Sequence, residues 1–161
     1  MATTGAPEEY QLRAEGLSLA IVATRWNARV VEQMTQRALE AARTYGVKAE
    51  VFTVDGAFDL PVVAQACAKR FDAVVALGCI IRGETAHFQY VSDAVISGLS
   101  RVALDEHTPV ANGVLTVEEE DQAYERAGGE DAKEDMGATA VRAALSSAVE
   151  LRKAGSLPVK G

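Results

Sequence analysis

The stretch AVVALGCIIRGETAHFQYVSDAVISGLSR, residues 73–101, decides the fold. Residues 73–81 form a short run that is rich in β-branched side chains and apolar on both faces, which predicts a central strand of a parallel sheet. After the polar turn 82–86, apolar residues recur at spacings of three and four, which predicts a helix with one buried face. The positions on that face are Phe88, Val91, Val95, Leu99 and Val102. Ligands of open α/β sheets bind beyond the carboxyl ends of the strands, and this turn lies at such an end.

The turn between the predicted strand and helix has the chemistry of an anion site. A helix start leaves N–H groups unpaired and carries a partial positive charge, so Gly83 and Thr85 could hold a phosphate or a carboxylate there. Glu84 could cap the helix and compete with the anion, or it could face solvent. His87 lies in the first helical turn, and an ordinary histidine pKa of about 6.5 suits proton transfer. An ordinary turn with a partly buried, hydrogen-bonded histidine is the alternative.

The same alternation of strand and helix continues on both sides of this stretch. The count of four strands and about five helices predicts an α/β protein with a flavodoxin-like, three-layer αβα sandwich around a four-stranded parallel sheet. Another strand-to-helix junction holds Trp26, which could stack on a planar heterocycle or pack against the core. A capping box of Thr116 and Glu119 predicts a helix start. The other predicted strands cover residues 17–24, 47–54 and 110–115, and the last helix covers residues 133–154.

Length and composition limit the classes of protein that fit. The 161 residues, 48% of them hydrophobic, predict a single domain over residues 17–154, with a flexible or assembly-ordered arm at 1–16 and a tail at 155–161. The net charge of −7 argues against binding nucleic acid or an anionic membrane. Residues 1–9 do not resemble a signal peptide, and no stretch has the length of a membrane span, which favours the cytoplasm. Cys67 and Cys79 have no metal-site spacing and are expected to be buried, reduced thiols.

Residues 78–91, GCIIRGETAHFQYV, resemble the signature of lumazine synthases, which perform the penultimate step of riboflavin biosynthesis. Further blocks extend the resemblance in the same order over residues 16–152. These blocks are RWN at 25–27, GAFDLP at 56–61, PVANGVLT at 109–116 and QAYERAG at 122–128. A dinucleotide or nucleoside triphosphate site is unsupported, because the chain has neither a Gly-x-Gly-x-x-Gly nor a Walker-type loop.

The resemblance implies a transferase that needs neither a metal nor an organic cofactor. Lumazine synthases condense 5-amino-6-(D-ribitylamino)uracil with 3,4-dihydroxy-2-butanone 4-phosphate and release phosphate and water, giving 6,7-dimethyl-8-ribityllumazine. The implied catalytic residues are His87 and Arg126. His87 would transfer protons, and Arg126 would reach across to a neighbouring subunit and bind the substrate phosphate there. Trp26 would stack on the pyrimidine. The implied substrate-binding residues are Trp26, Asn27, Ala57, Phe58, Asp59, Cys79, Ile80, Ile81, Gly83, Glu84, Thr85, Asn112 and Met136.

Two positions depart from the usual family pattern. Asp59 stands where glutamate is commoner, so its contact with the ribityl hydroxyls could pass through water. Met136 replaces a lysine of the phosphate pocket, and Lys133 is a candidate to supply the missing charge. These departures leave open a weakened paralogue that binds lumazine or flavin. An assembly protein, whose shell is its function, is a third hypothesis.

The resemblance also implies a homo-oligomer, because the site is shared between subunits. Family members form pentamers or sixty-subunit capsids, and the helix that begins near His87 lines the fivefold axis. The loop at residues 129–135 looks longer than in capsid-forming members, which favours the pentamer. Riboflavin synthase is a further partner that the resemblance suggests.

Overall fold

The computed structural model describes residue 5 and residues 10–159. Its sheet has four parallel strands in the order β2-β1-β3-β4. The strands are β1 (Ser18–Thr24), β2 (Lys48–Val54), β3 (Ala73–Ile81) and β4 (Val110–Val117). The prediction for residues 73–81 is confirmed at both ends, and the predicted four-stranded parallel sheet is confirmed with it.

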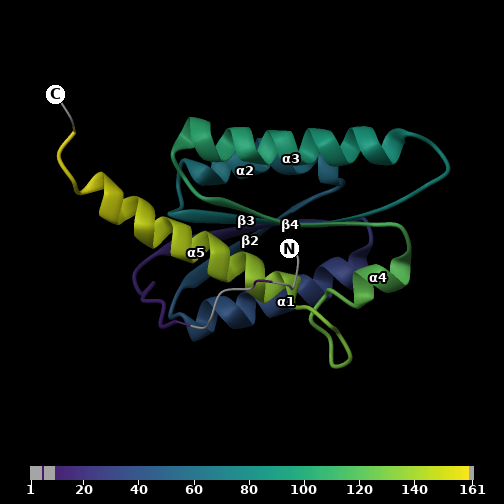
Figure 1. Cartoon of the computed structure of the whole chain (residues 1–161), viewed down its shortest axis with the longest axis horizontal. Coiled ribbons are helices and arrows are strands. Elements are labelled where there is room, and N and C mark those ends of the chain that lie inside the picture. The colour runs from purple at the N-terminus through teal and green to yellow at the C-terminus, as the bar shows by residue number, and fades with distance from the viewer. Residues whose placement is uncertain (1–4, 6–9, 160–161) are drawn as a thin grey trace.

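Helices cover both faces of the sheet, which confirms the three-layer sandwich (Figure 1). On one face α2 and α3 pack over β1, β3 and β4, and on the other face α1 and α5 do so. The helices are α1 (Ala28–Thr44), α2 (Leu60–Ala68), α3 (His87–Glu106), α4 (Glu120–Tyr124) and α5 (Met136–Gly155), and a 3₁₀ turn, η1 (Ala57–Asp59), precedes α2.

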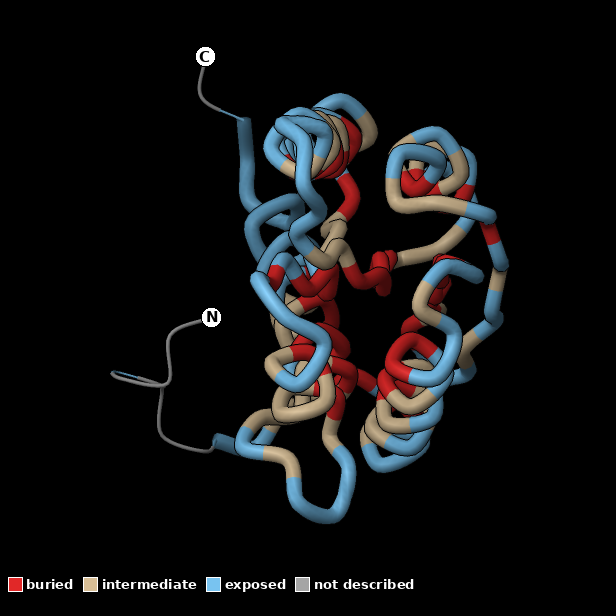
Figure 2. Tube along the Cα trace, turned by 90° about the vertical axis from the view of Figure 1, so that its right-hand side faces the viewer, coloured by how far each residue is buried: buried red, intermediate tan, exposed pale blue. Residues whose placement is uncertain are grey.

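The core consists of two apolar clusters, one on each face of the central strands β1 and β3. Alternate residues of β3 belong to opposite clusters: Val75 and Leu77 face α1 and α5, whereas Val74 and Ala76 face α2 and α3. This explains why the run is apolar on both faces. Figure 2 shows the buried positions concentrated between the helical layers. Burying one side chain the size of Leu77 stabilises the fold by about 1.5–3 kcal/mol.

Two predicted helix starts differ from the structure. Thr116 does not begin a helix, because β4 continues pairing with β3 up to the Ile81–Val117 pair, and α4 begins only at Glu120. The prediction that Thr116 and Glu119 form a capping box at a helix start is therefore wrong. The last helix begins at Met136, not at Lys133, and a carboxylate oxygen of Asp135 accepts the main-chain N–H of Ala138 (3.0 Å).

The described part of the N-terminal arm packs against α5. The hydroxyl of Tyr10 lies 2.6 Å from that of Ser146, and Arg142 donates to the main-chain oxygen of Tyr10 (3.2 Å). Ala14 is buried in the cluster that α1 and α5 share. Residues 1–4 and 6–9 of the predicted arm and residues 160–161 of the predicted tail lie outside the described residues.

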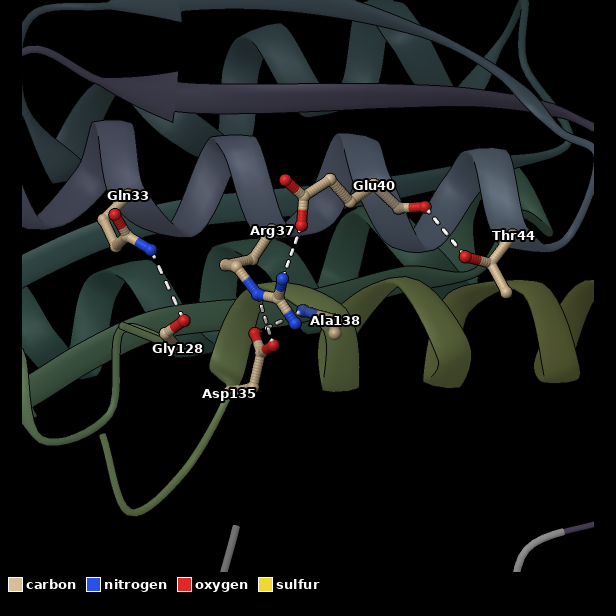
Figure 3. A network of polar contacts seen from close by, with 7 residues as sticks. All are labelled: Gln33, Arg37, Glu40, Thr44, Gly128, Asp135 and Ala138. Carbon is tan, nitrogen blue, oxygen red and sulfur yellow. Dashed lines mark hydrogen bonds and ion pairs between the residues drawn. The ribbon is translucent and has the colours of Figure 1, made fainter. Parts of the chain in front are cut away.

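A polar network ties the loop before α5 to the outer side of α1 (Figure 3). Nε of Arg37 donates to Oδ2 of Asp135 (2.8 Å), while Nη1 of Arg37 donates to Glu40 (2.5 Å). One turn earlier on α1, the amide of Gln33 donates to the main-chain oxygen of Gly128 (3.4 Å). The loop is thus held at both ends, at Gly128 and at Asp135, by a helix that is distant in sequence.

Candidate active site

The turns that follow β1 and β2 lie side by side at the carboxyl edge of the sheet. The main-chain N–H groups of Arg25 and Trp26 donate to the carbonyls of Val54 (2.9 Å) and Asp55 (3.2 Å). The side chains of Arg25 and Asp55 also form an ion pair (2.8 Å). Since parallel strands end at the same edge, these bonds bring the first two candidate segments together.

These two turns present aromatic rings to solvent. Trp26 is 72% exposed and Phe58 is 68% exposed. The alternative that Trp26 packs against the core is therefore not what this chain shows, and the indole is available for stacking. Beside Phe58, Oδ2 of Asp59 accepts the main-chain N–H of Gly56 (3.0 Å), which fixes the carboxylate on the η1 turn.

The turn after β3 is open, and α3 begins at its far end. Residues 82–87 are all exposed, and His87 is the first residue of α3. Ala86 occupies the N-cap position of α3 and makes no side-chain capping bond, so Glu84 does not fill that role. The main-chain N–H of His87 donates to the hydroxyl oxygen of Thr85 (3.4 Å). The partly buried histidine of the alternative reading is not seen, and the helix start remains accessible to an anion.

Arg82 attaches this turn to α3 and to the end of β4, and no sequence pattern indicated these contacts. Its guanidinium lies over the ring of Phe88, 4.2 Å from the centroid, and pairs with the carboxylate of Glu118. Its main-chain N–H donates to the carbonyl of Val117 (2.9 Å). Arg82 and Glu118 are 36 residues apart, so no local pattern could have shown that they meet.

The end of β3 forms the floor between these turns. Cys79 is only 4% exposed, and burial raises the pKa of its thiol to about 11. The thiol is therefore protonated near neutral pH and is not a nucleophile. The side-chain amide of Asn27 donates to the carbonyl of Cys79 (2.8 Å), so the Trp26 turn is attached to β3. Ile80 and Ile81 follow and are partly buried.

Arg126 and Met136 form a second group, on the face of the sheet that carries α1 and α5. Arg126 follows α4, and its guanidinium donates to the carbonyl of Gln122 (2.8 Å). The main-chain N–H of Met136 donates to the carbonyl of Arg126 (3.0 Å). The thioether of Met136 packs against the apolar cluster of α1 and α5, whereas the body of α3, the helix that His87 begins, packs on the opposite face.

Lys133 lies in this second group. Its ammonium is 2.5 Å from Oε1 of Glu125, and the other oxygen of that carboxylate is 3.6 Å from the guanidinium of Arg126. The hydrogen bond from Lys133 lowers the pKa of Glu125 below its usual value. Two cations therefore share one carboxylate, and one of them is Arg126, for which the family resemblance implies a contact with phosphate.

Asn112 lies apart from both groups. It is exposed on the edge strand β4, and its side-chain oxygen accepts the main-chain N–H of Val114 (3.0 Å). It pairs in register with Ala76, five residues before the end of β4 at Val117. At about 3.3 Å per residue, this places Asn112 about 16 Å from the carboxyl edge of its own chain.

A single chain therefore brings the turns after β1, β2 and β3 together at the carboxyl edge of the sheet. It places Arg126 and Met136 in a separate group, on the face that carries α1 and α5. Within residues 10–159, no group of three or more histidine, cysteine, aspartate or glutamate side chains is arranged to hold a metal ion. No helix in that part of the chain combines the length and apolarity needed to cross a membrane.

Comparison with known proteins identifies the family. The family model for 6,7-dimethyl-8-ribityllumazine synthase matches residues 16–152. The lumazine synthase of Thermobifida fusca is 53% identical over 154 residues, which cover 95% of this chain and 90% of that protein. The enzyme of Mycolicibacterium gilvum is 51% identical over 97% of this chain and 99% of its own length, and that of Corynebacterium glutamicum strain R is 49% identical over 94% and 95%. The chain therefore belongs to the 6,7-dimethyl-8-ribityllumazine synthase family.

Proposed function

We propose that the protein is a lumazine synthase of riboflavin biosynthesis. It condenses 5-amino-6-(D-ribitylamino)uracil with 3,4-dihydroxy-2-butanone 4-phosphate, releases phosphate and water, and works in the cytoplasm as a cofactor-independent transferase. The observation that carries the proposal is the carboxyl edge of the sheet. There the exposed ring of Trp26 lies on a turn that is hydrogen-bonded to β3, and β3 leads into the open helix start at His87.

Each part of this edge has a role in the proposed reaction. Trp26 stacks on the pyrimidine, and the turn holding Gly83 and Thr85 binds the phosphate through unpaired main-chain N–H groups. His87 accepts and returns protons during imine formation, elimination and ring closure. Holding both substrates in one orientation supplies the larger share of the rate acceleration. The remaining predicted contacts of this edge, Ala57, Phe58, Asp59, Cys79, Ile80, Ile81 and Glu84, line the pyrimidine and ribityl parts of the site. Asn27 supports this lining through its bond to the carbonyl of Cys79. Asn112, which lies away from the edge in its own chain, serves the site of a neighbouring subunit.

The proposed site is shared between subunits. Arg126 adjoins Ala127 of the cluster on the face opposite α3, and its guanidinium bonds to the carbonyl of Gln122. In the proposal it therefore binds substrate at the His87 turn of a neighbour rather than at the turn of its own chain. An apolar outer surface of α3 supports an oligomer, because Tyr90, Ile96 and Leu104 are exposed in the single chain. We propose a homopentamer, with riboflavin synthase as a further partner. Light scattering that shows a capsid-sized particle would contradict the pentamer.

The first test is lumazine formation, followed by absorbance and fluorescence, with both substrates and the unchanged protein. Turnover above the spontaneous condensation is expected. Met136→Lys is measured in parallel, because the thioether packs partly buried on the core and a lysine stem can follow the same path with its ammonium outside. Activity that appears only in Met136→Lys would mean that the native site is retired and would overturn the proposal.

Arg126→Ala is expected to raise the KM for the phosphate substrate by about 10- to 100-fold, since a charge-assisted hydrogen bond contributes about 1.5–3 kcal/mol.

Lys133→Ala should raise the same KM by less, because Lys133 reaches the site beside Arg126 through a shared carboxylate. Initial rates at varied phosphate substrate measure both effects. Lys153→Ala, on the exposed C-terminal end of α5, is the matched loss of charge. An unchanged KM in Lys133→Ala removes that residue from the site.

Trp26→Ala is expected to weaken pyrimidine binding by about 1–3 kcal/mol, the range measured for stacking of bases on aromatic side chains. The exposed ring contributes little to the core, so the midpoint of thermal unfolding should change little. Calorimetric titration with the ribitylaminouracil substrate or the lumazine product measures the loss. Full affinity in the variant would show that the ring is not the stacking platform.

A further inference from the structure

Asn27 has an unusual conformation for the residue that begins a helix. It occupies the N-cap position of α1, where an asparagine ordinarily has an extended backbone and caps the helix with its side-chain oxygen. Here its φ is 55°, in the left-handed region, and its side chain makes no capping bond. Its main-chain oxygen still accepts the N–H groups of Val30 and Val31 (both 3.1 Å). The side chain is therefore diverted from the helix to another partner.

That partner is the carbonyl of Cys79, to which Nδ2 of Asn27 donates at 2.8 Å. The ladder between β1 and β3 ends at the pair Ala23–Leu77, so Cys79 lies two residues beyond the last position of β3 that pairs with β1. The amide of Asn27 continues the connection between the two strands after the ladder has ended. On its other side the same turn is fixed to the end of β2, through the bond from Trp26 to Asp55.

The left-handed backbone is what directs the amide toward β3. This conformation costs most residues other than glycine about 1–2 kcal/mol, and asparagine and aspartate tolerate it better than the others. Among residues 10–159, the non-glycine residues with positive φ are Asn27 and His107. His107 ends α3 at the opposite edge of the sheet and is exposed. The two residues share a backbone conformation, but Asn27 alone of the two lies between the candidate substrate turns.

We propose that Asn27 is a positioning residue that sets the separation between the ring of Trp26 and the anion-binding turn after β3. The proposal rests on the proposed function, because it concerns the two subsites of that reaction. Without the bond, the pyrimidine still stacks on Trp26 and the phosphate still meets the helix start, but the two substrates lose their fixed orientation. The loss therefore falls on kcat rather than on binding, as expected when proximity supplies the acceleration.

Two variants remove the bond and keep the backbone conformation. Asn27→Gly loses the amide, and glycine adopts positive φ without strain. Asn27→Asp keeps the shape of the side chain and tolerates the left-handed region, but its carboxylate can only accept and cannot bond to a carbonyl. His107→Gly is the control, since it relieves the same strain at a position outside the proposed site.

The experiment compares kcat and both KM values of the three variants with those of the unchanged protein. Asn27→Gly and Asn27→Asp are expected to lower kcat by about 10- to 100-fold, because small misplacements of oriented reactants have effects of that size. Both KM values should change by less than about threefold, and His107→Gly should match the unchanged protein. An unchanged kcat, or a loss confined to one KM, overturns the proposal.

A second readout does not depend on catalysis. Trp26 is the single tryptophan of the chain, so the decay of its fluorescence anisotropy reports on this turn alone. Both Asn27 variants should show a larger nanosecond component of ring motion than the unchanged protein and His107→Gly. If the unchanged protein produced no lumazine, the proposed function would fail, and this measurement would decide the positioning role by itself. Equal anisotropy decays in all four proteins would overturn it.

Discussion

Replacing His87 by alanine is expected to slow lumazine formation by about 10²- to 10⁴-fold, the usual contribution of a general acid–base. The imidazole is the first side chain of α3 and is exposed beside the open turn that holds Gly83 and Thr85. Its loss removes the proton relay but leaves the stacking ring and the helix start in place. The residual rate should therefore still exceed the spontaneous condensation, because orientation of the substrates persists.

Single-turnover measurements with both substrates saturating separate this effect from binding. The midpoint of chemical denaturation should not change, because the His87 side chain is exposed and contributes no core packing. His107→Gly serves as the matched loss of a histidine outside the site. If His87→Ala turned over at the unchanged rate, the proton-transfer role would have to be assigned to another group or to water.

Gly137→Ala is expected to destabilise the protein by about 3 kcal/mol, at the upper end of the usual range for overpacking. A methyl group built at this position would lie 2.2 Å from the main-chain oxygen of Met34 and 3.1 Å from the main-chain nitrogen of Ala38. Both are backbone atoms of α1, which cannot rotate away as a side chain can. The first turn of α5 must therefore move off α1, against the packing of Val141 and Leu145 in the same cluster.

Urea denaturation of Gly137→Ala and of Gly155→Ala measures this effect against a matched control. Gly155 ends the same helix, and a methyl group there would meet nothing within 4 Å. Gly155→Ala should therefore leave the stability unchanged or raise it slightly through helix propensity. Equal denaturation midpoints for Gly137→Ala and the unchanged protein would show that α5 and α1 can separate without cost. Because Met136 adjoins Gly137, the KM for the phosphate substrate should rise as well.

The fold was largely predictable because its deciding element carries its pattern locally. The run at residues 73–81 is apolar on both faces since both faces are buried, and that is visible without any partner. The helix starts at Thr116 and Lys133 were mispredicted for a different reason. A capping box is a local signal, whereas the continuation of β4 to Val117 depends on its hydrogen bonds to β3, which no window of residues around Thr116 contains.

The candidate site likewise has features that a local sequence pattern predicts and features that depend on contacts between distant residues. A turn that opens a helix at His87 could be predicted from periodicity, but the exposure of Trp26 could not, because a core tryptophan and a stacking platform have the same sequence signal. The contacts that shape the site join residues far apart in the chain. Asn27 meets Cys79 across 52 residues, and Arg82 meets Glu118 across 36. Such pairs follow from strand order and register, which only the folded chain sets.

His87 begins α3, which packs on one face of the sheet, and Arg126 adjoins Ala127 of the cluster on the other face, an arrangement with a consequence for genetics as well as for chemistry. Under the proposed shared site, a chain is not the unit of activity, because each site borrows its arginine from the next chain. Two separately impaired proteins, one lacking the histidine and one the arginine, would then form intact sites at some of their shared interfaces when they assemble together. A harmful allele could thus be complemented by another, and dilution that separates the chains would inactivate molecules that remain fully folded.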